Sequence, residues 1–200
     1  MTLPNKITVF RFFLSPILFI LIILSQGVLI KVIALIVFLT AALTDLYDGY
    51  LARKYGDETE VGKVIDPLAD KFLITSAFLA FYLLKDTSEV FRDVKLWVII
   101  IILGREAVIM AFRYIAVVGH GNYFPASGLA KLKTLIQNIF IGSVLLRYAH
   151  WSIAGEYPDY SFQSFDVFHK YLNYYTLWLV IFLTTVSGVI YIVKFRHLVS

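Results

Sequence analysis

Hydrophobic positions in this chain form long, nearly uninterrupted stretches instead of the short alternations typical of a soluble fold. Six such segments follow one another, at roughly residues 12–30, 32–51, 67–84, 96–118, 129–146 and 171–193. A helix needs about 20 predominantly apolar residues to cross the hydrocarbon core of a bilayer. The pattern therefore predicts an all-α polytopic membrane protein with six transmembrane helices.

The first residues follow a different pattern. Residues 3–11 alternate loosely between apolar and polar side chains, and Lys6 and Arg11 are among the polar ones. This predicts a short N-terminal interfacial helix whose basic groups face lipid headgroups. The apolar stretch after Arg11 is too long for the hydrophobic region of a cleaved signal peptide, so we expect a retained spanning helix.

Composition excludes several classes of protein. With 60% hydrophobic and only 16% charged residues, the chain does not fit a water-soluble globule, and we expect one membrane domain over residues 1–200. The net charge of +4 comes without a contiguous basic stripe, which favours contact with anionic lipid over nucleic acid. The absence of cysteine excludes disulfides, thiolate metal sites and a cysteine nucleophile.

Charge placement predicts the topology. Six spans put both termini on one side, and placing that side in the cytoplasm leaves 12 Lys and Arg residues inside and 6 outside. The positive-inside rule favours this orientation. Because no Arg-rich presequence is present, we expect a bacterial cytoplasmic (inner) membrane. Residues 149–170 are then an external loop, whose aromatic side chains we interpret as interfacial anchors.

Three of the spans have uncharged cores that are too short. Residues 32–44, 72–84 and 134–146 are runs of 13 residues, which cover only about 20 Å as helix. These helices must continue into charged neighbours, and in an up-and-down chain those neighbours all lie at the cytoplasmic side. Ionisable groups within a membrane are costly unless they pair or face water. Their convergence predicts a polar pocket opened from the cytoplasm.

Four aspartates stand at helical spacing on either side of a polar turn. Asp45 and Asp48 are three residues apart, and Asp66 and Asp70 are four apart, so each pair shares one helix face. Four carboxylates in one pocket repel unless hard divalent cations neutralise them. We therefore expect Mg²⁺ or Mn²⁺, as one or two ions. The alternative is that these aspartates cap helices or form salt bridges.

Small and basic residues accompany the aspartates. Gly49 and Ala52 share the face of Asp45 and leave room for a ligand, Arg53 offers a bidentate fork for phosphate, and Gly62 permits close approach. Metal, arginine and small residues together predict a site for a diphosphate. An alcohol attacking a diphosphate also needs a base, and Asp70 lies one turn beyond Asp66. With no Ser, His or Cys arrangement for a covalent intermediate, direct in-line transfer is expected.

These residues match a known signature without a gap: DxxDGxxAR, eight residues, then GxxxDxxxD. Its fixed positions here are Asp45, Asp48, Gly49, Ala52, Arg53, Gly62, Asp66 and Asp70. The chain thus resembles the CDP-alcohol phosphatidyltransferase family. The resemblance implies a six-helix membrane enzyme, often a homodimer, that moves a phosphatidyl group from CDP-diacylglycerol to an alcohol and releases CMP. It further implies two metal ions on the four aspartates, with Asp70 also the general base, and a CDP-diacylglycerol site formed by Asp48, Gly49, Ala52, Arg53, Gly62 and Asp66.

The remaining intramembrane charges bear on the acceptor alcohol. Arg105, Arg113, Lys131 and Lys133 lie at the cytoplasmic ends of the fourth and fifth spans, with only Glu106 to oppose them. A cationic cluster beside a diphosphate site favours a second anion, hence a phosphorylated alcohol. Arg105 could instead pair with Glu106 structurally, and the two lysines could snorkel to the interface.

A second set of residues is similar to the phosphatidylglycerophosphate synthase branch of the family, which implies sn-glycerol 3-phosphate as acceptor. The acceptor-site residues implied are Arg105, Arg113, Lys131, Lys133, Thr134 and Gln137, and further candidates for substrate contact are Asn5, Thr8 and Arg11. Ala130 departs from that branch, which usually has Gly there. Inositol phosphate or phosphatidylglycerol are alternative acceptors, and a divalent-cation transporter is a distant alternative of another class.

Overall fold

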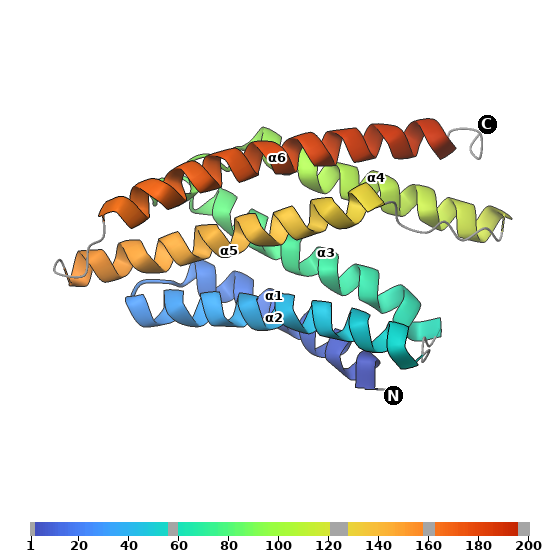
Figure 1. Ribbon diagram of the computed structural model, residues 1–200, viewed down its shortest axis with the longest axis horizontal. Coiled ribbons are helices and arrows are strands. Elements are labelled where there is room, and N and C mark those ends of the chain that lie inside the picture. Colours follow the sequence, from blue (N-terminus) through green and yellow to red (C-terminus); the bar gives the residue numbers. More distant parts are fainter. Residues whose placement is uncertain (1–2, 56–59, 121–127, 158–162, 196–200) are drawn as a thin grey trace.

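The computed structural model describes residues 3–55, 60–120, 128–157 and 163–195, with side chains described for 9–44, 71–111, 128–129, 132–157 and 163–193 (Figure 1). Every regular element in this part is helical, which confirms the all-α prediction. The elements are α1 (Leu3–Ile23), α2 (Val28–Tyr55), α3 (Glu60–Leu83), the short 3₁₀ helix η1 (Glu89–Phe91), α4 (Leu96–His120), α5 (Gly128–Glu156) and α6 (Gln163–Phe195).

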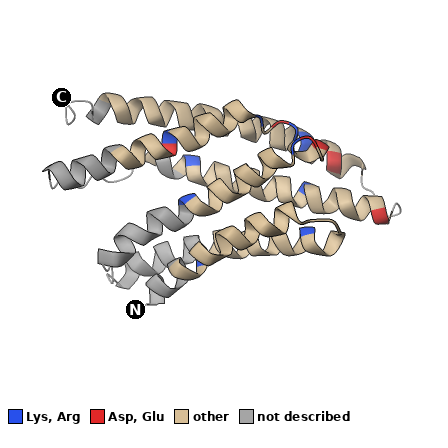
Figure 2. Cartoon of the chain, turned by 180° about the vertical axis from the view of Figure 1, so that it is seen from behind, with Lys and Arg blue, Asp and Glu red and all other residues tan. Residues whose placement is uncertain are grey.

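The long helices run up and down the bundle. Figure 1 shows that α2 ends, α3 begins, α4 ends and α5 begins at the same end of the bundle, where the first and last helices also have their outer termini. The sequence segments that carry the four aspartates and the basic residues of α4 and α5 therefore meet at one end. In Figure 2, a stretch with few charged residues separates this end from the charged opposite end.

The N-terminal segment differs from the prediction. The expected interfacial helix and first span form one continuous helix, α1, which includes Pro16 and ends at Ile23, before the predicted boundary at residue 30. Residues 5–15 contain no proline or glycine that would break the helix, and Pro4 lies in the first turn, where proline is tolerated. Arg11 is 1% exposed, so it is packed inside the bundle and not directed at headgroups. The prediction of a separate interfacial helix was therefore wrong.

The predicted external loop is also largely helical. α5 continues to Glu156 and α6 begins at Gln163, so part of residues 149–170 extends these two helices. An ion pair between the helices explains the extension: Arg147 Nε donates to Asp166 Oδ1 at 2.8 Å, and Arg147 is buried. A buried charge that is paired no longer ends an apolar helix.

Aromatic side chains hold the helices in register. Phe78 of α3 stacks on Phe140 of α5, with ring centroids 5.5 Å apart, and Phe81 stacks on Phe91 of η1 at 5.0 Å. Phe91 in turn contacts Tyr148 at 4.6 Å. Because α3 and α5 run in the same direction (Figure 1), this stacking fixes which residues of the two helices lie at the same level.

One helix in the described part of the chain is long and apolar enough to cross a membrane. It is Gln163–Val193, with a mean hydropathy of 2.2 in its most apolar window. The apolar parts of α1, α2 and α3 that are described, Val9–Ile23, Val28–Thr44 and Lys71–Leu83, are shorter. The six-span topology stays a prediction.

Candidate active site

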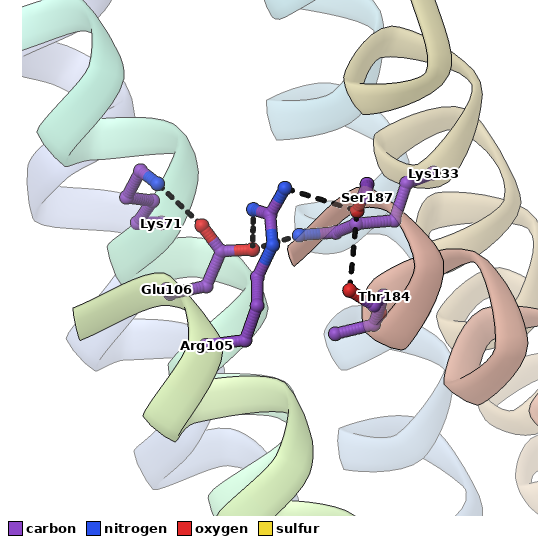
Figure 3. Close-up of polar contacts among 6 residues, drawn as sticks. All are labelled: Lys71, Arg105, Glu106, Lys133, Thr184 and Ser187. Atoms are coloured by element: carbon purple, nitrogen blue, oxygen red, sulfur yellow. Dashed lines mark hydrogen bonds and ion pairs between the residues drawn. The ribbon is translucent and has the colours of Figure 1, made fainter. Parts of the chain in front are cut away.

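A partly buried carboxylate contacts cations from three helices. Glu106 of α4 forms ion pairs with Lys71 of α3 and Lys133 of α5, and its Oε1 accepts from Arg105 Nη1 at 3.0 Å (Figure 3). We call these four side chains the Glu106 cluster. The cluster thus brings two lysines and an arginine close together, and these are the side chains that bind phosphate in proteins.

The aromatic stacking explains why these groups meet. Lys71 and Lys133 each lie seven residues, about two turns, before the stacked pair of Phe78 and Phe140, so both lysines lie at one level of the bundle. Lys133 is 3% exposed and Glu106 14% exposed. Buried charges at such depth need paired partners, because an isolated ion would lose its hydration without compensation. The cluster therefore contributes to the fold as well as to the site.

α6 completes the cluster from the other side. Arg105 Nη2 donates to Ser187 Oγ at 3.0 Å, and Ser187 Oγ donates to the Thr184 carbonyl at 3.1 Å (Figure 3). Ser187 is buried, and so is Thr184. The guanidinium of Arg105 is thus held between the carboxylate of its own helix and a hydroxyl of the C-terminal helix.

Gln137 is a buried side chain whose amide has no hydrogen-bond partner among the described residues, as is common for side chains that bind a ligand. It lies one turn after Lys133 on α5, on the same helix face, and is fully buried. Neither atom of its amide has a hydrogen-bond partner among the described residues. A buried amide without partners is unfavourable, and ligand or water normally satisfies such groups.

Arg11 also reaches this level of the bundle. Phe12 packs edge-on against Phe72 of α3, with centroids 5.0 Å apart, and Phe72 directly follows Lys71. The adjacent Arg11 is buried in this packing of α1 on α3. The side chains of the other two N-terminal candidates, Asn5 and Thr8, lie outside the described part.

The aspartate motif is described by its backbone. Its first half lies in the C-terminal part of α2 and its second half in the N-terminal part of α3, so the predicted helical spacing is present in both. The following side chains lie outside the described part: Asp45, Asp48, Gly49, Ala52, Arg53, Gly62, Asp66, Asp70, Arg113 and Lys131. Asp70 immediately precedes Lys71, so the motif adjoins the Glu106 cluster along α3. Among the described side chains, no three His, Asp or Glu residues form a metal site.

Comparison with known proteins identifies the relationship. Residues 1–191 match the CDP-alcohol phosphatidyltransferase family. The chain belongs to this family. It is 32% identical over 197 residues to the CDP-diacylglycerol–glycerol-3-phosphate 3-phosphatidyltransferase of Bacillus subtilis, covering 93% of this chain and 91% of that protein. The enzyme of the same name from Rickettsia typhi is 32% identical, with 94% of each chain covered.

A further relative is the probable phosphatidylglycerophosphate synthase of Mycobacterium tuberculosis strain H37Rv. It is 38% identical over 146 residues, which are 72% of this chain and 66% of that protein, so the match spans just under two thirds of its length. This chain is therefore identified as a phosphatidyltransferase of the family, and the resemblance predicted from the aspartate motif is confirmed.

The structure adds three residues to the candidate site that the sequence alone did not assign to it: Lys71, Glu106 and Ser187. Lys71 was not among the candidate site residues, and Glu106 entered only as a charge opposing its neighbours, yet Glu106 joins the cations of three helices. The sequence feature that could have identified Lys71 and Glu106 is a charged residue at the edge of, or within, an apolar segment. Ser187 lies within a long apolar helix, and nothing in the sequence around it indicated a role in the site.

Proposed function

We propose that this protein transfers the phosphatidyl group of CDP-diacylglycerol to sn-glycerol 3-phosphate, giving phosphatidylglycerophosphate and CMP. The observation that carries the proposal is the Glu106 cluster, which is partly buried, brings three cations together and lies next to Asp70 along α3. Family membership supplies the phosphatidyl transfer, and the names of the Bacillus and Rickettsia relatives support glycerol 3-phosphate as the acceptor.

The acceptor's phosphate binds to the cations of α4 and α5. Arg105 supplies a planar fork and Lys133 a point charge, which are the two ways in which proteins hold phosphate. Gln137 lies one turn further along α5 and donates to the acceptor from its buried amide. The remaining acceptor-site residues in this proposal are Arg113, Lys131 and Thr134. Arg11, Asn5 and Thr8 contact substrate from α1.

The aspartate motif holds the donor. Asp45, Asp48, Asp66 and Asp70 form an all-oxygen donor set that fits Mg²⁺ or Mn²⁺, and we propose two ions. When bound, these ions neutralise charge on the diphosphate and its leaving group. Asp48 and Asp66, together with Gly49, Ala52, Arg53 and Gly62, receive the CDP part of the donor.

Asp70 acts as the general base. It takes the proton from a hydroxyl of the acceptor, whose oxygen attacks the phosphatidyl phosphorus in line as the bond to CMP breaks. Arg105 and Lys133 hold the acceptor's own phosphate, so the hydroxyl is oriented toward Asp70. The reaction then needs no covalent enzyme intermediate.

We further propose that the reaction takes place at the cytoplasmic face of a bacterial membrane. All 200 residues form one membrane domain with six transmembrane helices. Both termini and the site face the cytoplasm of a bacterium, and the protein is a homodimer. The common end of the bundle, where α2, α3, α4 and α5 meet, would then lie at the cytoplasmic leaflet (Figure 1).

Product analysis tests the proposal. Detergent-purified protein is incubated with CDP-diacylglycerol, Mg²⁺ or Mn²⁺, and one acceptor at a time: glycerol 3-phosphate, inositol phosphate or phosphatidylglycerol. Mass spectrometry of the lipid product should show phosphatidylglycerophosphate with the first acceptor. A product formed with either of the other acceptors instead would refute the acceptor assignment, and absence of any product would refute the transfer itself.

A further inference from the structure

The C-terminal helix contributes to the site through Arg105. In Figure 3, Arg105 and Glu106 lie between Lys71 on one side and Ser187 and Lys133 on the other. The Arg105 guanidinium donates two hydrogen bonds in different directions, from Nη1 to Glu106 Oε1 and from Nη2 to Ser187 Oγ, both at 3.0 Å. Two bonds in different directions fix the plane of a guanidinium.

The direction of the hydroxyl bond is fixed as well. Ser187 Oγ donates its only proton to the Thr184 carbonyl at 3.1 Å, so the oxygen can meet Arg105 only as an acceptor. Because Ser187 is 4% exposed, water competes little for this oxygen. The hydroxyl therefore accepts from Arg105 in a single orientation.

Gly188 provides the space for the arginine stem. A Cβ atom at position 188 would lie 3.1 Å from Arg105 Cγ and 3.9 Å from Arg105 Nε. A contact of 3.1 Å is closer than ordinary van der Waals packing, so a side chain at 188 would displace the stem by a few tenths of an ångström. Ser187 thus accepts a hydrogen bond from the Arg105 guanidinium, and Gly188 leaves the space that the Arg105 side chain occupies.

We propose that the Ser187–Gly188 step of α6 positions the guanidinium of Arg105 for the acceptor's phosphate. This rests on the proposed function, because it assigns a task to the same acceptor site. Bidentate binding of phosphate by arginine depends on geometry, so a tilted guanidinium binds the acceptor more weakly. The donor site is formed by α2 and the start of α3, and a change on α6 leaves it unaltered.

The test compares KM values in three alanine variants. Ser187→Ala removes the acceptor oxygen, Gly188→Ala fills the gap, and Thr185→Ala is the matched control, since Thr185 donates to the Ile181 carbonyl on the same helix. We expect Ser187→Ala and Gly188→Ala each to raise the KM for glycerol 3-phosphate about tenfold. The KM for CDP-diacylglycerol and kcat should stay within about twofold of wild type, and Tm within a few degrees. Ser187→Thr, which keeps the hydroxyl, should restore most of the loss.

Other outcomes would overturn the positioning role. An unchanged acceptor KM in both variants would do so, and so would equal rises in both KM values, which indicate general distortion. If Ser187→Ala does not fold, Gly188→Ala and Ser187→Thr decide by the same comparison. A wild-type protein that is inactive with glycerol 3-phosphate would instead refute the proposed function, so the two failures are distinguishable.

Discussion

Replacing Glu106 by glutamine keeps the shape of the side chain and removes the one carboxylate of the Glu106 cluster. The change removes the carboxylate that Lys71, Arg105 and Lys133 share and leaves their like charges close together. Breaking a buried ion pair costs about 3–5 kcal/mol, and we take the lower value because the cluster is partly exposed and the glutamine oxygen still accepts hydrogen bonds. For a chain of 200 residues, about 3 kcal/mol corresponds to a fall in Tm of about 6–12 °C.

Thermal unfolding of the purified protein, with and without glycerol 3-phosphate, measures this effect. The fall in Tm should shrink at saturating glycerol 3-phosphate, because the phosphate of the acceptor replaces the missing negative charge. Glu89→Gln is the matched control. Its ion pair with Arg92, at 2.6 Å, is solvent-exposed, and such pairs contribute at most about 1 kcal/mol. Equal Tm changes in Glu106→Gln and Glu89→Gln would refute the buried-cluster reasoning.

Three further predictions concern single groups. Asp70→Asn should abolish turnover and leave the binding of CDP-diacylglycerol intact, because only the base is lost; a parallel loss of donor binding, measured by equilibrium binding, would contradict the role. Lys133→Ala should raise the KM for glycerol 3-phosphate at least about tenfold with little change in the KM for CDP-diacylglycerol, as initial rates would show. Asp166→Asn should lower Tm, since it leaves Arg147 buried beside a neutral partner, but should not change either KM; a changed acceptor KM would mean that the two ends of the bundle are coupled.

Charges within apolar stretches made much of the site predictable. Arg105 and Lys133 stand out because an ionisable group in a hydrophobic helix is rare and needs a partner. Their common partner did not stand out, because Glu106 reaches Lys71 and Lys133 only once α3, α4 and α5 come together in the bundle. The hydropathy pattern carries no information on which helices are neighbours.

Other features depend on tertiary structure alone. Ser187 resembles any serine that bonds to a carbonyl three residues earlier in its own helix, and only the position of Arg105 gives it a second partner. The end of α1 at Ile23 does have a local signal, the polar turn Ser25, Gln26 and Gly27, but the apolar residues on both sides of it made one continuous span the expectation. The extension of α5 follows from the pairing of Arg147 with Asp166 across two helices, which no local pattern encodes.

The most direct test of the central claim compares glycerol 3-phosphate with glycerol as acceptor in the same CMP-release assay. The two acceptors offer the same hydroxyl chemistry and differ in the phosphate that the Glu106 cluster is proposed to bind. A site built to hydrogen-bond one group of its substrate rejects an analogue without that group by a factor of about 10⁴ or more in kcat/KM. The account predicts rapid CMP release with glycerol 3-phosphate and almost none with glycerol, and comparable rates with both acceptors would contradict it.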